Sequence, residues 1–299
     1  MQKKIKIAFI GSVLFSSNLL DSLIKIKFIE IVAVITKKRK KLKSDFCDLG
    51  KISKKHGLKT YYVNNINSKQ IFYILKEADV DYIFCFGWSQ LLSKKILNTA
   101  KSFAVGYHPS DLPANRGRHP IIWALSLGLQ KTASCFFKLN EKADDGLILS
   151  KKYVKISSKD KAKTLYAKLI KVAKSQIENL TLNLYKKNLK IIKVKKAKNN
   201  IWRKRDYNDG KIDWRMSAIS INNLIKALSK PYDGAHFIHK NREFKVFDSK
   251  IIKFNKDNIE PGKILSVKRC NLMVKCGLQA LLLKNFKSYK NFKNGEYLK

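Results

Sequence analysis

The chain has 299 residues, 45% of them hydrophobic, so it can bury one large core or two smaller ones. Lys and Arg number 63 against 22 Asp and Glu, a formal charge of +41. The chain contains no uninterrupted apolar run of about eighteen residues, so no membrane-spanning helix is expected. The five cysteines form no CxxC pair and no metal-binding spacing. Their odd number and the lack of a leader sequence predict a reducing, cytoplasmic location and no bound metal.

The excess positive charge has two interpretations. A polyanionic partner such as nucleic acid or an anionic membrane would explain it. A compositional preference for lysine explains it as well, because only eight of the 63 basic residues are Arg and the lysines are spread almost evenly. Nucleic-acid surfaces usually cluster their charge and favour the forked guanidinium of Arg. We therefore favour the compositional interpretation and expect no membrane association.

Continuous apolar runs predict strands, and apolar residues at helical spacing predict helices between them. In chain order we expect strand 5–10, helix 16–26, strand 29–35, basic loop 37–45, helix 46–56, strand 61–66, helix 68–78, strand 81–88, helix 89–97, strand 103–108, helix 120–129, strand 132–139 and helix 160–187. This α/β alternation is typical of a Rossmann-like, mostly parallel sheet with helices on both faces.

The pattern of predicted helices and strands changes near residue 200. The charged stretch 188–200 fits a linker or an edge strand, and a helix predicted at 221–230 ends at Pro231. Short apolar runs then predict strands at 235–240, 242–252, 262–267, 271–277 and 280–286. We expect a first domain at 1–200 and a small β-rich, open-barrel domain at 201–299.

Rigid and titratable residues are concentrated in one loop, GYHPSDLPANRGRHP, which spans 106–120. It holds two of the five His and three of the five Pro of the chain. His108 closes one apolar strand and Asp144 follows the next, and ligands of parallel sheets bind beyond strand ends of this kind. A carboxylate beside an imidazole stabilises the charged ring, so the pair is a candidate acid–base centre. The plainer interpretation is a histidine that only closes its strand.

Several segments resemble the 10-formyltetrahydrofolate-dependent formyltransferases, a family that includes methionyl-tRNA formyltransferase and the nucleotide-sugar N-formyltransferases. AFIGSVLFSSNLLDSL is similar to the family's opening strand, turn and helix. HPSDLPANRGRHPIIWAL is similar to its HxxLLPxxRGxxPIxxA segment, and FFKLNEKADDGLIL to its FxMxxGxDxGxIL segment. WRKRDYNDGKIDW, LIKALSKPYDGAHF and EFKVFDSK are similar to its carboxyl-terminal module. The matches follow the family's order through nearly the whole chain.

The resemblance implies an enzyme that transfers a formyl group from 10-formyltetrahydrofolate, its cosubstrate, to a primary amine. It implies that His108 and Asp144 are catalytic. It further implies a folate site whose members are Phe86, Gly87, Trp88, Leu92, Asn140 and Ala143. Gly11, which lies just past a strand end, and Arg116 and Arg118 are candidate contacts to the acceptor. Core packing is an equal alternative for Phe86 and Trp88, and Arg116 could instead brace its loop against an Asp.

Gly106 departs from the family pattern, which has Asn two residues before the catalytic His. Glycine has no side chain that could donate a hydrogen bond. Another donor such as Asn115, His119 or a backbone N–H could replace the Asn, the enzyme could be slower, or a larger acceptor could need the space. We favour a substitute donor.

Two acceptors fit the resemblance, a nucleotide-linked amino sugar and initiator tRNA. The basic loop after the second strand lacks the PSPVK-like stretch of the tRNA enzymes, and GYHP and RGRHPIIWALSLG resemble the sugar-formylating and uncharacterised branches of the family more than the tRNA branch. We therefore favour the sugar; a homodimer is also conceivable. Outside enzymes, a degenerate site would leave a folate- or nucleotide-binding module, and a basic RNA-binding protein ranks last because no aromatic and basic residues interleave.

Overall fold

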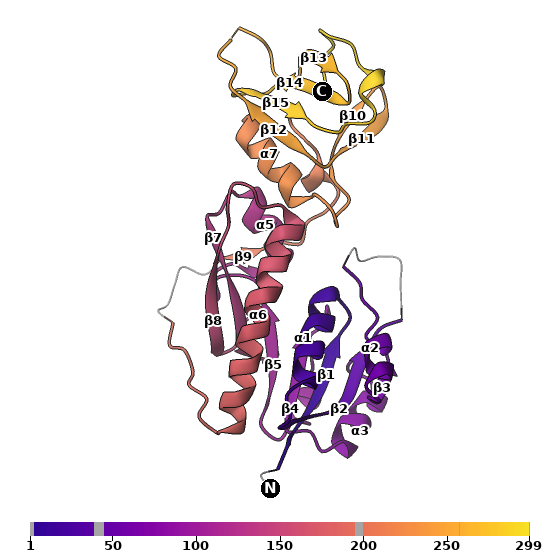
Figure 1. Cartoon of the computed structure of the whole chain (residues 1–299), viewed down its shortest axis with the longest axis vertical. Coiled ribbons are helices and arrows are strands. Elements are labelled where there is room, and N and C mark those ends of the chain that lie inside the picture. Colours follow the sequence, from indigo (N-terminus) through magenta and orange to yellow (C-terminus); the bar gives the residue numbers. More distant parts are fainter. Residues whose placement is uncertain (1–2, 39–44, 195–199, 257, 299) are drawn as a thin grey trace. The chain divides into compact units, whose positions relative to one another are not determined.

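The structure, a computed structural model, describes residues 3–38, 45–194, 200–256 and 258–298. It divides into two compact units, which are described separately (Figure 1). The first unit comprises Met1–Gly117, Thr132–Val154 and Ala167–Trp202, and the second comprises Arg118–Lys131, Lys155–Tyr166 and Arg203–Lys299. Most of the basic loop expected at 37–45 lies outside the described residues.

A seven-stranded sheet forms the centre of the first unit, in the order β3-β2-β1-β4-β5-β7-β8. Its strands are β1 (Ile5–Gly11), β2 (Ile29–Thr36), β3 (Thr60–Tyr62), β4 (Tyr82–Phe86), β5 (Phe103–His108), β7 (Lys131–Lys138) and β8 (Ile148–Lys155). The neighbouring strands from β3 to β5 pair in parallel, whereas β5 and β7 pair antiparallel. The expected mostly parallel sheet is confirmed.

Helices cover both faces of this sheet. Because side chains alternate along a strand, Ile10 of β1 faces a cluster that contains Ile71 of α3, while Phe9 points to the other face. There Phe9 contacts Phe86, whose ring meets Phe15 of α1. The helices of the first unit are α1 (Leu14–Ile24), α2 (Gly50–Lys55), α3 (Lys69–Glu77), α4 (Lys94–Leu97) and most of α6 (Ala162–Tyr185), whereas α5 (Pro120–Ser126) belongs to the second unit.

The second unit is rich in antiparallel strands, as expected. A helix, α7 (Ala218–Ala227), is capped by the preceding Ser217, whose hydroxyl accepts from Ser220 N at 3.1 Å and so satisfies a free helix donor. Strands β10 and β11 form one sheet, and the other four form a second sheet in the order β12-β15-β14-β13. Their bounds are β10 (Ala235–His239), β11 (Arg242–Val246), β12 (Ser249–Ile252), β13 (Ile264–Lys268), β14 (Asn271–Lys275) and β15 (Ala280–Leu283).

Two very short strands complete the first unit. Strand β6 (Arg116–Gly117) pairs in parallel with β9 (Ile201–Trp202). Within the stretch 188–200, Ile192 N donates to Ile148 O at 2.9 Å, so this part runs beside β8 as an edge segment. Residues 195–199 of that stretch lie outside the described part.

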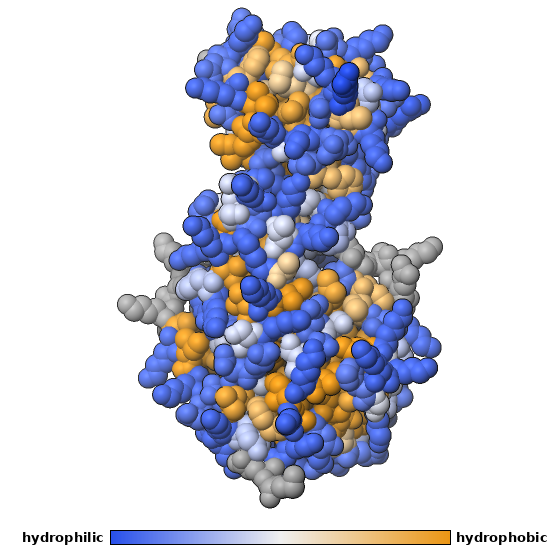
Figure 2. Space-filling model, in the orientation of Figure 1, coloured by the Kyte–Doolittle hydropathy of each residue, from blue (hydrophilic) through white to orange (hydrophobic). Residues whose placement is uncertain are grey.

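Hydrophilic residues cover most of the face drawn in Figure 2, and apolar residues show there as separate patches. In the described part of the chain, no helix is both long enough and apolar enough to cross a bilayer.

Candidate active site

His108 is the last residue of β5 and is 6% exposed. Its strand is apolar and pairs with β7, where Cys135 lies opposite His108. The sheet therefore fixes the backbone of the histidine, and the ring lies in a largely dry environment. Its Nε2 atom is buried and has no hydrogen-bond partner among the described residues.

Asp144 lies in the loop after β7 and brings its carboxylate to the His108 ring. Its Oδ1 is 3.3 Å from His108 Nδ1, and its Oδ2 accepts a hydrogen bond from Gly117 N at 3.1 Å. A carboxylate at Nδ1 favours the tautomer that carries its proton on that nitrogen. Nε2 is then the basic nitrogen of the ring. The structure thus brings together the two residues that the sequence singled out as an acid–base pair.

Burial is the largest influence on the His108 imidazole and lowers its pKa below the ordinary value of 6.5. The charge of Asp144 and a hydrogen bond to the backbone of Asn115 act in the opposite direction. A lowered pKa means that the ring is neutral at neutral pH and can accept a proton. Asp144 then compensates the positive charge that appears on the ring.

Gly117 is a site residue that sequence reasoning missed. Its φ is +105°, and an added Cβ would lie 2.2 Å from the carbonyl oxygen of Trp202 in the paired strand β9. Both the backbone angle and the close approach require glycine here. The sequence shows a glycine between Arg116 and Arg118. It does not show that this glycine pairs with Trp202, 85 residues later in the chain.

The two arginines beside Gly117 differ. Arg116 forms an ion pair with Asp145, the residue after Asp144, and so braces the loop that carries the carboxylate. Arg118 is exposed. The geometry therefore agrees with the bracing interpretation of Arg116, and it leaves Arg118 as an acceptor contact suggested by the sequence alone.

The space beside Gly106 is filled by apolar side chains. A Cβ built on this glycine would lie 2.6 Å from Cδ2 of Leu139 and 2.9 Å from Cζ of Phe137. The suggestion that the glycine leaves room for a larger acceptor therefore has no support. Of the proposed substitute donors, Asn115 uses its backbone N–H on Asn200 Oδ1, at 2.7 Å.

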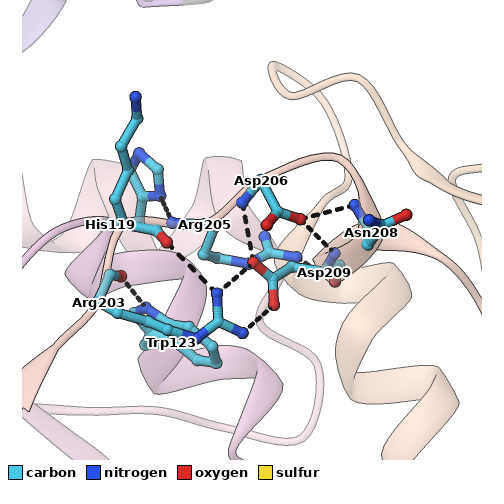
Figure 3. A network of polar contacts seen from close by, with 8 residues as sticks. His119, Trp123, Arg203, Arg205, Asp206, Asn208 and Asp209 are labelled. Carbon is cyan, nitrogen blue, oxygen red and sulfur yellow. Dashed lines mark hydrogen bonds and ion pairs between the residues drawn. The ribbon is translucent and has the colours of Figure 1, made fainter.

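His119, another proposed donor, belongs to a polar network of the second unit (Figure 3). Its Nδ1 accepts from Arg205 N at 3.3 Å. Arg203 pairs with both carboxylate oxygens of Asp209, one of them at 2.7 Å, and its guanidinium lies 5.4 Å from the centre of the Trp123 ring. His119 Nδ1 is thus already engaged as an acceptor, and sequence reasoning did not anticipate this network.

Two glycines near the predicted folate site permit a close approach of the chain. A Cβ on Gly11 would lie 2.4 Å from Cβ of Ser16, and a Cβ on Gly87 would lie 2.2 Å from Cγ2 of Val13. The approach lets the Ser16 hydroxyl donate to Phe86 O at 2.6 Å. Gly11 therefore has a structural reason to be glycine, independent of any ligand.

The remaining predicted folate contacts divide into core and accessible positions. The Phe86 ring is fully buried in the aromatic core, so only the backbone of this residue could meet a ligand. Leu92 is 4% exposed, whereas Trp88 is half-buried beneath Lys37 Nζ, 4.5 Å from its ring centre. The indole Nε1 of Trp88 is buried and has no partner among the described residues.

Asn140 and Asp144 line a cavity of about 740 Å³ in the first unit. Its other walls include Leu112, Leu139 and Ile192. Ala143, in the same loop as Asn140, is exposed but is not among the lining residues. Asp144 therefore borders a space large enough for a small-molecule substrate.

Comparison with known families gives two matches. The pattern described as formyl transferase matches residues 4–180, and the pattern described as formyl transferase, C-terminal domain, matches residues 204–295.

Many curated proteins are similar in sequence, including the following two. The chain is 34% identical over 302 residues to the bifunctional polymyxin resistance protein ArnA of Wigglesworthia glossinidia brevipalpis, covering 92% of this chain and 46% of that protein. It therefore spans less than half of that relative. It is 31% identical over 289 residues to methionyl-tRNA formyltransferase of Buchnera aphidicola subsp. Acyrthosiphon pisum, covering 94% of this chain and 90% of that protein.

Solved structures share the fold. The sugar 3N-formyl transferase WlaRD, solved with dTDP and 5-N-formyl-THF, has a TM-score of 0.72 at 18% identity, over 95% of this chain and 98% of that one. The N-formyltransferase of Helicobacter canadensis, in complex with folinic acid and dTDP-3-aminofucose, has a TM-score of 0.71 at 17% identity, over 94% and 99%. With the two family matches and the Buchnera relative, these findings show that the chain belongs to the formyl transferase family of enzymes.

Proposed function

We propose that this formyltransferase moves the formyl group of 10-formyltetrahydrofolate to the primary amine of a nucleotide-linked amino sugar. One observation carries the chemistry: Asp144 Oδ1 lies 3.3 Å from His108 Nδ1, while His108 Nε2 is buried without a partner among the described residues. Family membership supports the reaction class, and the ring and carboxylate supply the proton transfers that the reaction needs.

The folate is proposed to bind at the carboxyl end of β4. A flat heterocycle binds best in an apolar slot edged by a few polar groups, and the half-buried indole of Trp88 offers apolar surface there. The unpartnered Trp88 Nε1–H is a buried donor, which is costly unless a ligand accepts from it. A carbonyl or ring nitrogen of the pterin would satisfy it. When bound, 10-formyltetrahydrofolate supplies a formyl carbon attached to N10.

His108 transfers the proton in the proposed reaction. The acceptor amine must be uncharged to bond to the formyl carbon. Nε2 takes one proton from the amine nitrogen as this bond forms. It returns the proton to N10 as the bond from the formyl carbon to N10 breaks, so the products are the formamide and tetrahydrofolate. Positioned proton transfer of this kind accelerates reactions about 10²–10⁴-fold.

Asp144 is the partner of the charged ring. It holds the proton on Nδ1 before the reaction and stabilises the imidazolium during it. The backbone N–H of Gly117 and the Arg116–Asp145 ion pair keep its loop in place.

Three observations favour the sugar acceptor. The loop after β2 lacks the PSPVK-like stretch, and GYHP at 106–109 is closer to the sugar-formylating branch. Among the structures that share this fold over nearly their full length are an N-formyltransferase holding dTDP-3-aminofucose and a sugar 3N-formyl transferase.

Initiator methionyl-tRNA is the second candidate. It is favoured by the Buchnera methionyl-tRNA formyltransferase, 31% identical over 90% of that protein, and by the charge of +41. The two candidates differ in their response to salt, because each phosphate contact to a nucleic acid releases counterions and steepens the salt dependence of binding.

A direct assay separates the two acceptors. The protein is supplied with 10-formyltetrahydrofolate and either nucleotide-linked 3-amino and 4-amino sugars or charged initiator tRNA, and tetrahydrofolate release is followed. We expect turnover with an amino sugar and only a mild effect of salt on its KM. Turnover with tRNA alone, with KM rising steeply with salt, would overturn the sugar assignment and leave formyl transfer intact.

A further inference from the structure

A second cavity, of about 670 Å³, lies wholly within the second unit. Its walls come from the start of α6, the turn after α7, the end of β11 and the segment after β15. Its volume falls in the range of small-molecule sites, about 300–1,000 Å³. None of the residues assigned above to formyl transfer belongs to it.

Lysine dominates the wall of this cavity. Lys and Arg make up 63 of the 299 residues of the chain, whereas six of the fourteen lining residues are lysines. The even spread of lysine along the sequence therefore does not account for the concentration here. The six are Lys161, Lys163, Lys230, Lys245, Lys284 and Lys287.

Acidic residues compensate only part of this charge. Asp248, the single acidic lining residue, lies 2.9 Å from Lys161, and Glu243 lies 3.5 Å from Lys245. Nearby, the pKa of Lys226 is lowered, first by burial and then by the charge of Lys161. Positive charge is thus in excess around a concave surface, where it attracts anions most strongly.

The floor of the cavity is apolar and aromatic. Val246 is 2% exposed and Phe286 is 4% exposed, and the half-buried Phe247 ring has Lys230 Nζ 4.6 Å from its centre. Asn285 adds a side-chain amide to the wall. A ligand that combines phosphate groups with a flat ring matches this surface.

We propose that this cavity is an accessory binding site for a nucleoside diphosphate. The lysines meet the diphosphate, and the nucleobase packs on the Phe247 and Phe286 floor. A nucleic acid fits less well, because its regularly spaced phosphates call for an extended basic stripe, and here the lysines converge on one hollow. The site stands independently of formyl transfer, so its test reads binding and not turnover.

Lysine-acetylation footprinting followed by peptide mass spectrometry tests the proposal on the full-length chain. The probes are dTDP, inorganic pyrophosphate and a short RNA oligonucleotide. We expect dTDP to protect Lys284 and Lys287 and to leave Lys250, an exposed lysine of β12 outside the cavity, unprotected. The same protection in His108→Ala would separate this site from the catalytic one, whatever the acceptor proves to be.

Other footprinting results would overturn the proposal. Protection by pyrophosphate as strong as by dTDP would show an anion site with no nucleoside recognition. Stronger protection by RNA would identify a nucleic-acid surface. No protection, or equal protection of Lys250, would leave no specific site.

A pair of matched variants gives a second test. Lys163→Gln with Lys287→Gln removes two lining charges, and the control, Lys250→Gln with Lys253→Gln, removes two charges elsewhere in the same unit. We expect the first pair to weaken dTDP binding, measured by the footprint as a function of concentration, on the order of tenfold in Kd. Equal weakening by both pairs would mean that only net charge matters and would refute the site.

Discussion

Gly117 and Asp144 are joined by a hydrogen bond of 3.1 Å from the backbone N–H to carboxylate Oδ2. The other oxygen of the same carboxylate lies 3.3 Å from His108 Nδ1. A backbone amide, fixed by the pairing of β6 with β9, therefore sets the direction from which the carboxylate meets the imidazole. In the mechanism proposed above, the orientation of the His108 ring therefore depends on this contact as well as on its own strand.

Asp144→Asn should lower kcat by about 10²–10⁴, because the imidazolium loses its compensating charge. It should also lower the pKa of His108 further below 6.5, because the charge of Asp144 acts against the effect of burial. NMR titration of the His108 ring in both proteins measures the shift. An unchanged pKa would mean that the carboxylate does not act on this ring.

His108→Gln should reduce kcat by a similar factor while KM for the folate changes little, since His108 is not among the folate contacts expected above. Steady-state kinetics with varied folate separates the two constants, and circular dichroism checks the fold. Near-normal turnover would remove His108 from the catalytic set.

Gly117→Ala should destabilise the protein and slow the reaction. At a φ of +105° and with its Cβ only 2.2 Å from Trp202 O, the alanine would displace the backbone whose N–H donates to Asp144. Gly57→Ala is the matched control, because Gly57 also has a positive φ, of +64°, but nothing lies within 4 Å of its Cβ. The control should cost about 1 kcal/mol and leave kcat unchanged. Equal effects of the two changes on kcat would contradict a role for Gly117.

Gly106→Asn should be destabilising by about 1–3 kcal/mol, as expected for overpacking, because its Cβ would meet Leu139 at 2.6 Å. Adding Leu139→Ala should recover part of that loss. A double-mutant cycle from denaturant unfolding measures the coupling between the two sites. Strict additivity would show that Leu139 does not occupy the space beside Gly106.

Asp209→Asn tests the network of the second unit. Hydrogen bonds from Arg203, the largest influence, hold the pKa of Asp209 at about 2, below its ordinary 3.8. The ionised carboxylate therefore stabilises the fold above pH 3.8, and this contribution is lost as the pH falls towards about 2. Calorimetry should show a Tm difference between wild type and variant at neutral pH that shrinks across this window. A difference that persists at pH 2 would contradict the assignment.

Much of the architecture could be predicted from the sequence, because short, largely apolar runs such as 5–10 and 103–108 are typical of strands buried on both faces. The helix expected at 89–97 begins later, at Lys94, because Ser93 and not Ser89 provides the cap, its hydroxyl accepting from Ile96 N. The run 242–252, expected as one strand, divides into β11 and β12, which belong to different sheets. Neither glycine nor proline marks that break, so local sequence could not reveal it.

The reactive residues of the candidate site could be predicted from the sequence, but the contacts that hold them in place could not. His108 and Asp144 stand out as residue types at strand ends, and the structure places them together. What fills the space beside Gly106 is set by Leu139, over thirty residues away in the chain, and spacing along the sequence says nothing of such a contact. For the same reason the sequence could not show whether the Phe86 ring packs in the core or contacts a ligand.

The pairing of β6 with β9 limits how far the chain can be truncated from its carboxyl end without disturbing the Asp144 carboxylate. A fragment truncated after residue 200 would lack Ile201 and Trp202, and the segment that orients the Asp144 carboxylate would lose its neighbouring strand. An engineered fragment meant to retain formyl-transfer competence should therefore extend at least through Trp202.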